Sequence, residues 1–210
     1  MGEKKGNLLF NAIAPIYGLF FNGQKTRYKE TVREVKPKFD LTSFKTVLDV
    51  GCGTGAFSSV LDDFGLKVTA IDPARKMLKI AASKTKEQPI RFEQENILEG
   101  LPYEDNAFDV VISSYVVHGL EKEERKQMYK EMSRVAREYV LIHDYNDKRS
   151  FLTSVIEYLE GGDYFHFIKH AKKEMKDCVS QMKTCFTHVE VIEVGVRANW
   201  YICRTKQENR

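Results

Sequence analysis

Short apolar runs alternate with amphipathic segments through residues 46–145 of the chain. The apolar runs, rich in valine and isoleucine, predict strands at 46–50, 67–72, 90–96, 108–117 and 138–145. Segments with apolar residues every three or four positions predict helices at 56–64, 74–84 and 122–137. Strands that alternate with helices in this way indicate a mostly parallel sheet with helices on both of its faces.

The C-terminal part of the chain follows another pattern. Residues 151–182 predict two helices separated by Gly161 and Gly162, and the runs 188–196 and 199–205 predict strands. The gap between these strands is too short for a crossover helix, so we expect them to pair antiparallel. The whole pattern predicts an α/β fold: a doubly wound, Rossmann-like, seven-stranded sheet, mostly parallel, that ends in an antiparallel hairpin.

Six apolar side chains near the N-terminus lie mostly three or four positions apart: Phe10, Ile13, Ile16, Tyr17, Phe20 and Phe21. This spacing predicts a helix with one apolar face, although Pro15 limits the helix that precedes it. A short isolated helix is unstable in water, so it must dock on the rest of the protein. We therefore divide the single domain into an N-terminal helical lid segment, residues 1–40, and the sheet-containing part, residues 41–210.

The first residues also resemble a secretion signal, because two lysines precede an apolar stretch. Four residues interrupt that stretch: Asn7, Asn11, Pro15 and Gly18. It is also too short to span a bilayer. We expect the segment to belong to the mature protein, and the protein to be cytoplasmic with no transmembrane segment.

Composition narrows the possible functions. The chain has 210 residues, of which 42% are hydrophobic, enough for one domain with a sizeable core. A formal net charge of only +3 argues against a nucleic-acid partner. The four cysteines show no C-x-x-C spacing, so we expect reduced thiols and neither a disulfide framework nor a metal site: they are Cys52, Cys178, Cys185 and Cys203.

The stretch "VLDVGCGTGAFS", residues 47–58, breaks a buried strand with three glycines. Gly51 and Gly53 allow a sharp turn and a close approach of a ligand to the backbone. In a doubly wound sheet, ligands bind at the carboxyl ends of the strands. Asp72 closes the second strand, 21 residues after Gly51, where an acceptor-only carboxylate suits ribose hydroxyls. The spacing therefore predicts a nucleoside-containing ligand, and Gly51, Gly53 and Ala56 also fit the dinucleotide pattern G-x-G-x-x-A.

Three stretches together carry a family resemblance. Residues 47–58 resemble the first motif of the class I S-adenosylmethionine-dependent methyltransferases, and "AIDPARKML" (70–78) resembles their second-strand motif. "ENILEGLPYEDNAFDVVISSYVVHGL" (95–120) resembles their third and fourth strands. Upstream, "FNAIAPIYGLFFN" (10–22) is similar to the lead-in of the ubiquinone/menaquinone-biosynthesis type, with Gly18 where that type has Asp. The resemblance implies S-adenosyl-L-methionine as cofactor and S-adenosyl-L-homocysteine as product.

The resemblance also implies roles on the nucleoside side of this cofactor. Asp72 would hold the ribose. Pro73 and Met77 would cover the adenine, although Met77 sits at helical spacing and equally suits the core. Asn96, where the family has Asp, would accept a hydrogen bond from the adenine amino group, next to Ile97.

On the methionine side, Asp49 would orient the glycine loop and meet the methionine amino group, or only end its strand in a polar residue. The loop residues Gly51, Cys52 and Gly53 would back the methionyl and ribose parts. The remaining positions would line the methyl region or close over the methionine end: Ser113, Tyr115, Tyr17 and Arg27. A solvated surface position remains the alternative for Arg27.

The reaction needs a general base only if the acceptor loses a proton. His143 follows the fifth strand's apolar run and His118 follows the fourth strand, so either is a candidate base, or a structural histidine. The aromatic N-terminal stretch and residues 161–168 would form the pocket of a small-molecule acceptor, or pack helices onto the core. Two other functions stay open, an NAD(P)-dependent oxidoreductase and a cofactor-binding protein without catalysis, and the oligomeric state is not predicted.

Overall fold

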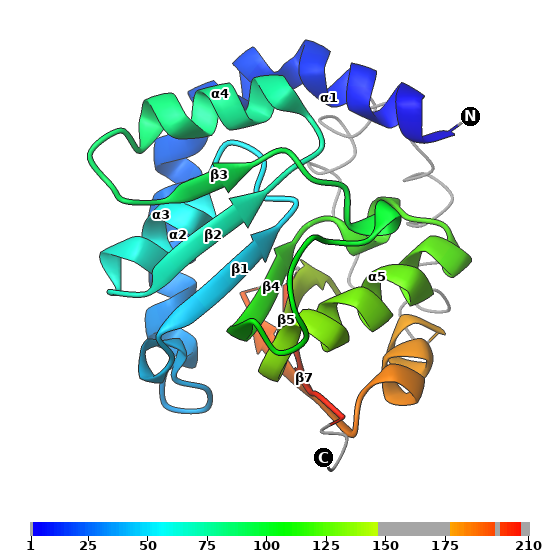
Figure 1. Cartoon of the computed structure of the whole chain (residues 1–210). Helices are drawn as coiled ribbons and strands as arrows, with labels where there is room; N and C mark the ends of the chain where they lie inside the picture. Colours follow the sequence, from blue (N-terminus) through cyan, green and yellow to red (C-terminus); the bar gives the residue numbers. More distant parts are fainter. Residues whose placement is uncertain (1, 147–176, 196–197, 207–210) are drawn as a thin grey trace.

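The computed structural model describes residues 2–146, 177–195 and 198–206. Seven strands form one sheet in the order β3-β2-β1-β4-β5-β7-β6 (Figure 1). Their bounds are β1 Thr46–Val50, β2 Lys67–Ile71, β3 Arg91–Glu93, β4 Phe108–Ser114, β5 Ala136–Tyr145, β6 His188–Val194 and β7 Ala198–Arg204. Strands β1 to β5 pair parallel, whereas β7 pairs antiparallel with both β5 and β6. The predicted sheet and its antiparallel hairpin are confirmed.

Helices cover both faces of this sheet. They are α1 Gly2–Leu19, α2 Phe21–Val35, α3 Ala56–Asp63, α4 Arg75–Lys84 and α5 Lys122–Val135, and residues 177–185 are also helical. Buried side chains of α2, α3 and α4 pack on one face of the sheet, and those of α5 and residues 177–185 pack on the other. Strands β1 and β4 are neighbours near the centre of the sheet. From β1 the chain adds β2 and β3 toward one side, and from β4 it adds β5 toward the other. The place between β1 and β4 is therefore the switch point where such folds bind ligands.

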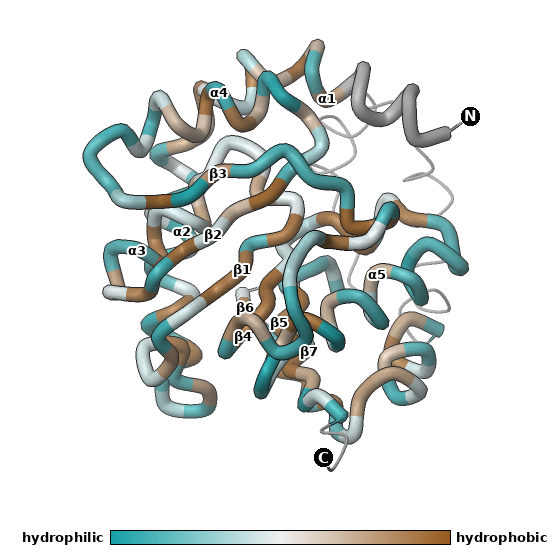
Figure 2. Tube along the Cα trace, viewed as in Figure 1, coloured by the Kyte–Doolittle hydropathy of each residue, from teal (hydrophilic) through white to brown (hydrophobic). Residues whose placement is uncertain are grey.

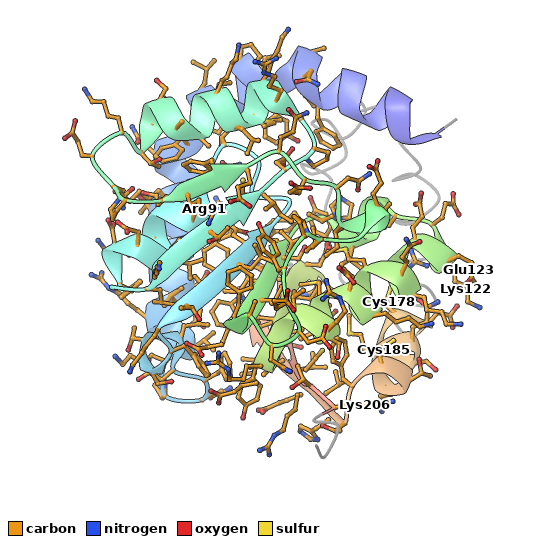
Figure 3. All side chains as sticks on the ribbon, in the orientation of Figure 1. Arg91, Lys122, Glu123, Cys178, Cys185 and Lys206 are labelled. Carbon is orange, nitrogen blue, oxygen red and sulfur yellow. The ribbon has the colours of Figure 1, made fainter. Side chains whose placement is uncertain are left out.

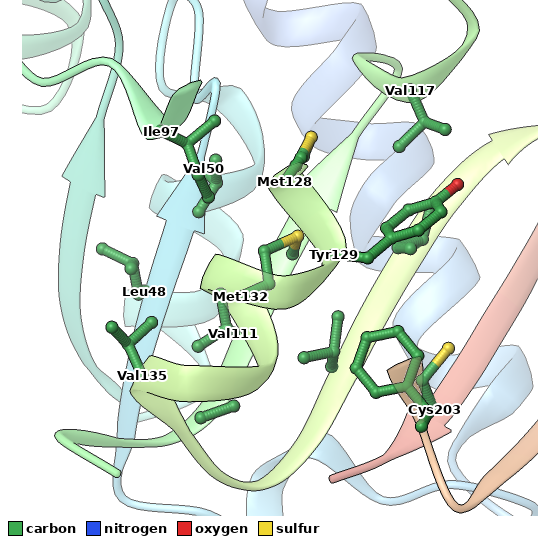
Figure 4. Close-up of a cluster of buried hydrophobic side chains, with 14 of the residues drawn as sticks. Leu48, Val50, Ile97, Val111, Val117, Met128, Tyr129, Met132, Val135 and Cys203 are labelled. Atoms are coloured by element: carbon green, nitrogen blue, oxygen red, sulfur yellow. The ribbon is translucent and has the colours of Figure 1, made fainter. Parts of the chain in front are cut away.

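The core lies in two layers because successive strand residues point to opposite faces of the sheet. On the α5 face, Met128, Tyr129 and Met132 pack over Leu48 and Val111 (Figure 4). Figure 2 shows the same division along the chain: the central strands are hydrophobic, and the outer faces of the helices are hydrophilic. Charged side chains lie on the surface, as Arg91 does on the edge strand β3 and Lys122 on α5 (Figure 3).

Two strands end three residues earlier than the pattern predicts, and both ends lie at the ligand edge of the sheet. The strand expected at 90–96 stops at Glu93, because the Asn96 side chain accepts from the backbone N–H of Leu98 and begins the short helix η2, Ile97–Glu99. The strand expected at 108–117 stops at Ser114, because Tyr115 adopts a left-handed φ of 55°. A second short helix, η3, Val117–Gly119, follows.

The N-terminal segment is helical, but its apolar face differs from the predicted one. Helix α1 continues through Pro15, whose exposed ring faces away from α4 while the neighbouring Ala14 is buried against it. Ile13 and Tyr17 pack with Met77, and Asn11 accepts a hydrogen bond from the backbone N–H of Lys76. Three of the expected apolar contacts are instead exposed: Phe10, Ile16 and Phe20.

Among the residues described, no helix combines the length and the apolar character needed to cross a membrane. The expected helices at 151–182 can be followed only in their last part, since residues 147–176 lie outside the described residues.

Candidate active site

The glycine loop joins β1 to α3 and is held against the end of β2. The backbone N–H groups of Gly51 and Cys52 both donate to the carbonyl of Ile71, at 2.8 and 3.0 Å. Gly51 has a φ of 71°, and a Cβ atom there would come within 2.5 Å of Val116. Gly53 has a φ of 54°, but a Cβ atom there would meet nothing within 4 Å. Gly51 is therefore required by packing, whereas Gly53 faces open space.

Asp72 connects this loop to the start of α4. One carboxylate oxygen accepts from the N–H of Gly53 at 2.9 Å, and the other accepts from the N–H of Ala74 at 2.7 Å. The side chain is buried, and burial raises the pKa of the carboxyl although the two backbone bonds oppose this shift. Each carboxylate oxygen has a second lone pair, so Asp72 can accept from a ligand while it holds the loop.

Asp49 lies at the same edge, on β1. Its carboxylate is buried and accepts a hydrogen bond of 2.5 Å from the Ser58 hydroxyl of α3. Burial, reinforced by the charge of Asp72, raises the pKa of Asp49 to about 6. Among the described residues no lysine, arginine or histidine forms an ion pair with Asp49 or Asp72. A cationic group that enters this space would therefore relieve the repulsion between two carboxylates.

The residues expected around the adenine already have contacts in the protein. Met77 is buried with Ala14 and Ala74, and Tyr17 packs on the same cluster. The Asn96 oxygen accepts from Leu98, and its amide group donates to Glu99. Ile97 is part of the core on the α5 face, and Pro73 accepts a hydrogen bond from Gln94 through its carbonyl oxygen. These contacts fix the residues in place.

An aromatic cluster forms the part of the edge beyond β4. The Tyr28 ring of α2 stacks on Phe57 with centroids 4.5 Å apart and meets His143 edge-on at 5.6 Å. Tyr115 lies 4.9 Å from His143, ring to ring. The Arg27 charge lowers the pKa of Tyr115 against the larger effect of burial, so this exposed arginine lies on the same side.

Tyr28 was not predicted as a site residue. Its spacing from Val32 and Val35, four and seven positions, places it on the buried stripe of α2, and this signal could have identified it.

The two candidate histidines have different environments, because His143 and its neighbour Asp144 point to opposite faces of β5. His143 is buried among aromatic rings, and its Nδ1 has no hydrogen-bond partner within the described residues. Burial lowers the pKa of His143 to about 4, although Asp144 acts in the other direction. At neutral pH the ring is uncharged and binds protons weakly.

His118 forms a pair with Asp144 instead. Its Nδ1 lies 2.9 Å from one carboxylate oxygen of Asp144, and its backbone N–H donates to the other at 3.2 Å. The first oxygen also accepts from the N–H of Tyr145, and the Asp144 side chain is buried. A carboxylate on Nδ1 favours the tautomer that carries its proton there and has its lone pair on Nε2. The carboxylate therefore fixes the orientation of the imidazole, and Asp144 was not identified as a site residue from the sequence.

Ser113 and Tyr115 complete the described edge. The hydroxyl of Ser113 is buried with no hydrogen-bond partner among the described residues, which is uncommon for a buried polar group. Tyr115 is a non-glycine residue with a left-handed φ, a strained conformation that is often found at functional sites. The expected acceptor region at 161–168 lies outside the described residues.

Comparison with known proteins agrees with this geometry. Residues 48–142 match the model of a family described as "Methyltransferase domain". Uncharacterized methyltransferases are 23% identical in Staphylococcus carnosus, over 83% of this chain and 85% of the relative, and 27% identical in Bacillus licheniformis, over 85% and 86%. The crystal structure of magnesium protoporphyrin IX methyltransferase from Synechocystis, with bound S-adenosylhomocysteine, superposes with a TM-score of 0.61 at 16% identity, over 88% of this chain and 84% of that one. The methyltransferase resemblance and the Rossmann-like fold are confirmed.

Burial of neutral His143 makes stability fall in acid. The unfolded chain takes up a proton near pH 6.5, but the folded chain does so only near pH 4. As pH falls from about 6.5 to 4, the free energy of unfolding should decrease by up to about 3 kcal/mol from this residue. Asp49 acts in the opposite sense, since its raised pKa favours proton uptake by the folded chain below about pH 6.

Urea unfolding between pH 7 and 4 measures this effect in the wild type and in His143→Gln. The variant should show a smaller acid loss than the wild type. His188→Gln, at an exposed position on β6, is the control and should keep the wild-type pH dependence. Identical pH dependences for wild type and His143→Gln would contradict the neutral state of His143.

Proposed function

We propose that this chain transfers a methyl group from S-adenosyl-L-methionine to a small-molecule acceptor, because residues 48–142 match the family model of a methyltransferase domain. The bond between Asp72 and Gly53 carries the proposal. It places a buried carboxylate beside a glycine that faces open space, at the switch point of the sheet. A ribose needs the carboxylate, and the glycine permits its close approach.

The residues at this edge suit the cofactor from one end to the other. Asp72 would hold the ribose, with Gly51, Cys52 and Gly53 beneath it. The carboxylate of Asp49 suits the methionine ammonium group, because it is buried and has no cationic partner among the described residues. The adenine would be bordered by Pro73, Met77, Asn96 and Ile97. The methionine end would be bordered by Ser113, Tyr115 and Arg27. Tyr17 lies with the Met77 cluster, so contact with the adenine side suits it better than contact with the methionine end.

The cofactor supplies a sulfonium-activated methyl group, and the protein has to align the acceptor with it and exclude water. His118, oriented by Asp144, is the better candidate base where the acceptor loses a proton. His143 is the weaker candidate because burial favours its neutral, weakly basic form. We assign His143 the task of shaping the aromatic wall with Tyr28 and Tyr115.

The aromatic lining and the weak net charge favour a small molecule over a nucleic acid as acceptor. The methyltransferase domain match disfavours the alternative of an NAD(P)-dependent oxidoreductase. The alternative of a binding protein without catalysis is disfavoured by the His118–Asp144 pair, because a pure binding site has no need of an oriented base.

Removal of the Asp72 carboxylate should weaken cofactor binding. Asp72→Ala should bind S-adenosylhomocysteine with about 1.5–3 kcal/mol less free energy, the range for hydrogen bonds to charged groups. Titration calorimetry measures the affinity. Asp109→Asn is the control, since Asp109 is equally buried but accepts from the backbone N–H groups of Lys45 and Thr46 at the start of β1, at the opposite end of the strands. Equal affinity of Asp72→Ala and wild type would mean that the ribose lies elsewhere.

Loss of the oriented base should lower turnover without loss of cofactor affinity. Transfer of labelled methyl groups to a panel of alcohols, phenols, thiols and amines identifies an acceptor. On that acceptor His118→Asn should reduce kcat by about 10²- to 10⁴-fold, the usual contribution of a general base. Affinity for S-adenosylhomocysteine should stay at the wild-type value, and His143→Asn serves as the comparison variant. A His118→Asn enzyme with wild-type kcat would remove this residue from the mechanism.

We also propose that α1, within the lid segment 1–40, closes over the cofactor. It packs on α4 through a small cluster of Ala14, Ala74 and Met77 and through the Asn11–Lys76 bond, so it is attached less extensively than the sheet helices. Hydrogen exchange in residues 10–19 should therefore slow when S-adenosylhomocysteine is added. Exchange that is unaffected by the ligand would show α1 to be ordinary packing; exchange in α5 is the internal control.

A further inference from the structure

Exposed apolar side chains gather on one helix of this protein. Among the described residues six large hydrophobic side chains are exposed, and four of them lie between positions 10 and 20: Phe10, Ile16, Leu19 and Phe20. Leu19, the last residue of α1, is 81% exposed. Exposed apolar residues at spacings of three and four form an outer stripe along α1: Ala12, Pro15, Ile16 and Leu19.

This outer stripe lies on the side of α1 that faces away from α4. On the opposite side of the helix, Ala14 is buried with Met77, and Gly18 lies against Ile80 of α4. The stripe therefore adds nothing to the attachment of α1 to the protein. A contiguous apolar surface of this kind is typical of a site of interaction.

Helix α4 lies beside α1 and carries only positive charge (Figure 1). Its four charged side chains are all exposed: Arg75, Lys76, Lys79 and Lys84. Among the described residues no acidic side chain forms an ion pair with any of them. Residues 10–29 and 74–86 contain no aspartate or glutamate, although the whole chain has a formal net charge of only +3.

The cations of α4 follow the outer stripe along its length. The backbone N–H of Lys76 donates to the Asn11 side chain at one end of the stripe. The Lys84 ammonium group lies 6.0 Å from the centre of the Phe21 ring, just beyond the other end. The result is an apolar strip on α1 that is bordered by cations without acidic partners among the described residues.

The surface of an anionic lipid bilayer matches both features. Its headgroups attract lysine and arginine, and the apolar side chains of a helix that lies flat enter the boundary between headgroups and acyl chains. A nucleic acid would pair with the cations but leave Ile16 and Leu19 in water. A twofold contact between two copies would cover the stripe but bring the same cations toward one another.

We propose that the outer stripe of α1 and the cations of α4 form a docking surface for an anionic lipid bilayer, with α1 parallel to the membrane plane. No described helix has the length and apolar character to cross a membrane, so this contact is peripheral. The inference goes beyond the proposed function and does not depend on it. It uses side chains other than Tyr17 and Met77, which pack together on the inner side of α1.

Co-sedimentation of the full chain with large unilamellar vesicles tests this surface. Wild type should bind vesicles of phosphatidylcholine mixed with phosphatidylglycerol more tightly than vesicles of phosphatidylcholine alone. Ile16→Gln combined with Leu19→Gln should lower the partition coefficient at least about 10-fold, because two apolar side chains no longer enter the interface. Arg75→Gln combined with Lys79→Gln should lower it about 10-fold or more on the mixed vesicles and remove most of the preference for anionic lipid.

Two controls carry the same substitutions on other surfaces. Val191→Gln changes an exposed large hydrophobic side chain on β6, and Lys126→Gln combined with Lys130→Gln removes two exposed cations from α5. Both should bind the mixed vesicles like wild type. Equal melting temperatures of all variants would show that the fold is kept.

Three outcomes would overturn the docking surface. The first is a wild type that does not bind the mixed vesicles, or an Ile16/Leu19 double variant that binds them equally well. The second is a dimer in analytical ultracentrifugation that this double variant loses, without vesicle binding, which would make the stripe a contact between copies. The third is oligonucleotide binding that only the Arg75/Lys79 double variant loses, without vesicle binding, which would make the partner a nucleic acid.

Discussion

The two backbone hydrogen bonds that Asp72 accepts hold the ligand edge of this protein together. One comes from the glycine loop after β1, and the other from the start of α4 after β2. The N-cap residue of α4, Ala74, has no side chain that can cap the helix. The Asp72 carboxylate instead accepts from the N–H of Ala74, which would otherwise lack this partner at the start of the helix. The charge is kept in a buried place, against the cost of burial, by these two bonds. The same group is therefore a structural clamp and, in the proposed function, would also hold the ribose.

The edge is arranged so that one strand serves two purposes. His143 and Asp144 are adjacent on β5, but side-chain alternation sends the first toward α2 and α3 and the second toward α5. His143 becomes an uncharged member of an aromatic wall. Asp144 becomes the partner of His118, which arrives from the turn after β4. In the proposed function, the residue of the aromatic wall and the residue that orients the candidate base are therefore neighbours in the sequence.

The sequence predicts the sheet well because its information is local. Each strand and each helix from 46 to 145 has its own period, and the glycines mark the loop with positive φ at Gly51 and Gly53. The ends of β3 and β4 were predicted too long, since a side-chain cap at Asn96 and a strained Tyr115 override an apolar run. The apolar face of α1 was predicted only in part, because which positions are buried depends on where α4 lies.

Contacts between distant segments explain what sequence reasoning missed at the site. Asp144 becomes a site residue only through His118, and Tyr28 only through Ser114, and no local period records either pair. Both pairs join an element to the end of β4 or to the turn that follows it, beside the glycine loop at the switch point. The buried carboxylates of Asp49 and Asp72 lie at that loop, and Arg27 lies beyond it. In the proposed function, a ligand that carries a cationic centre and a carboxylate at one end would match these charges, which favours an aminoacyl sulfonium over a neutral nucleoside.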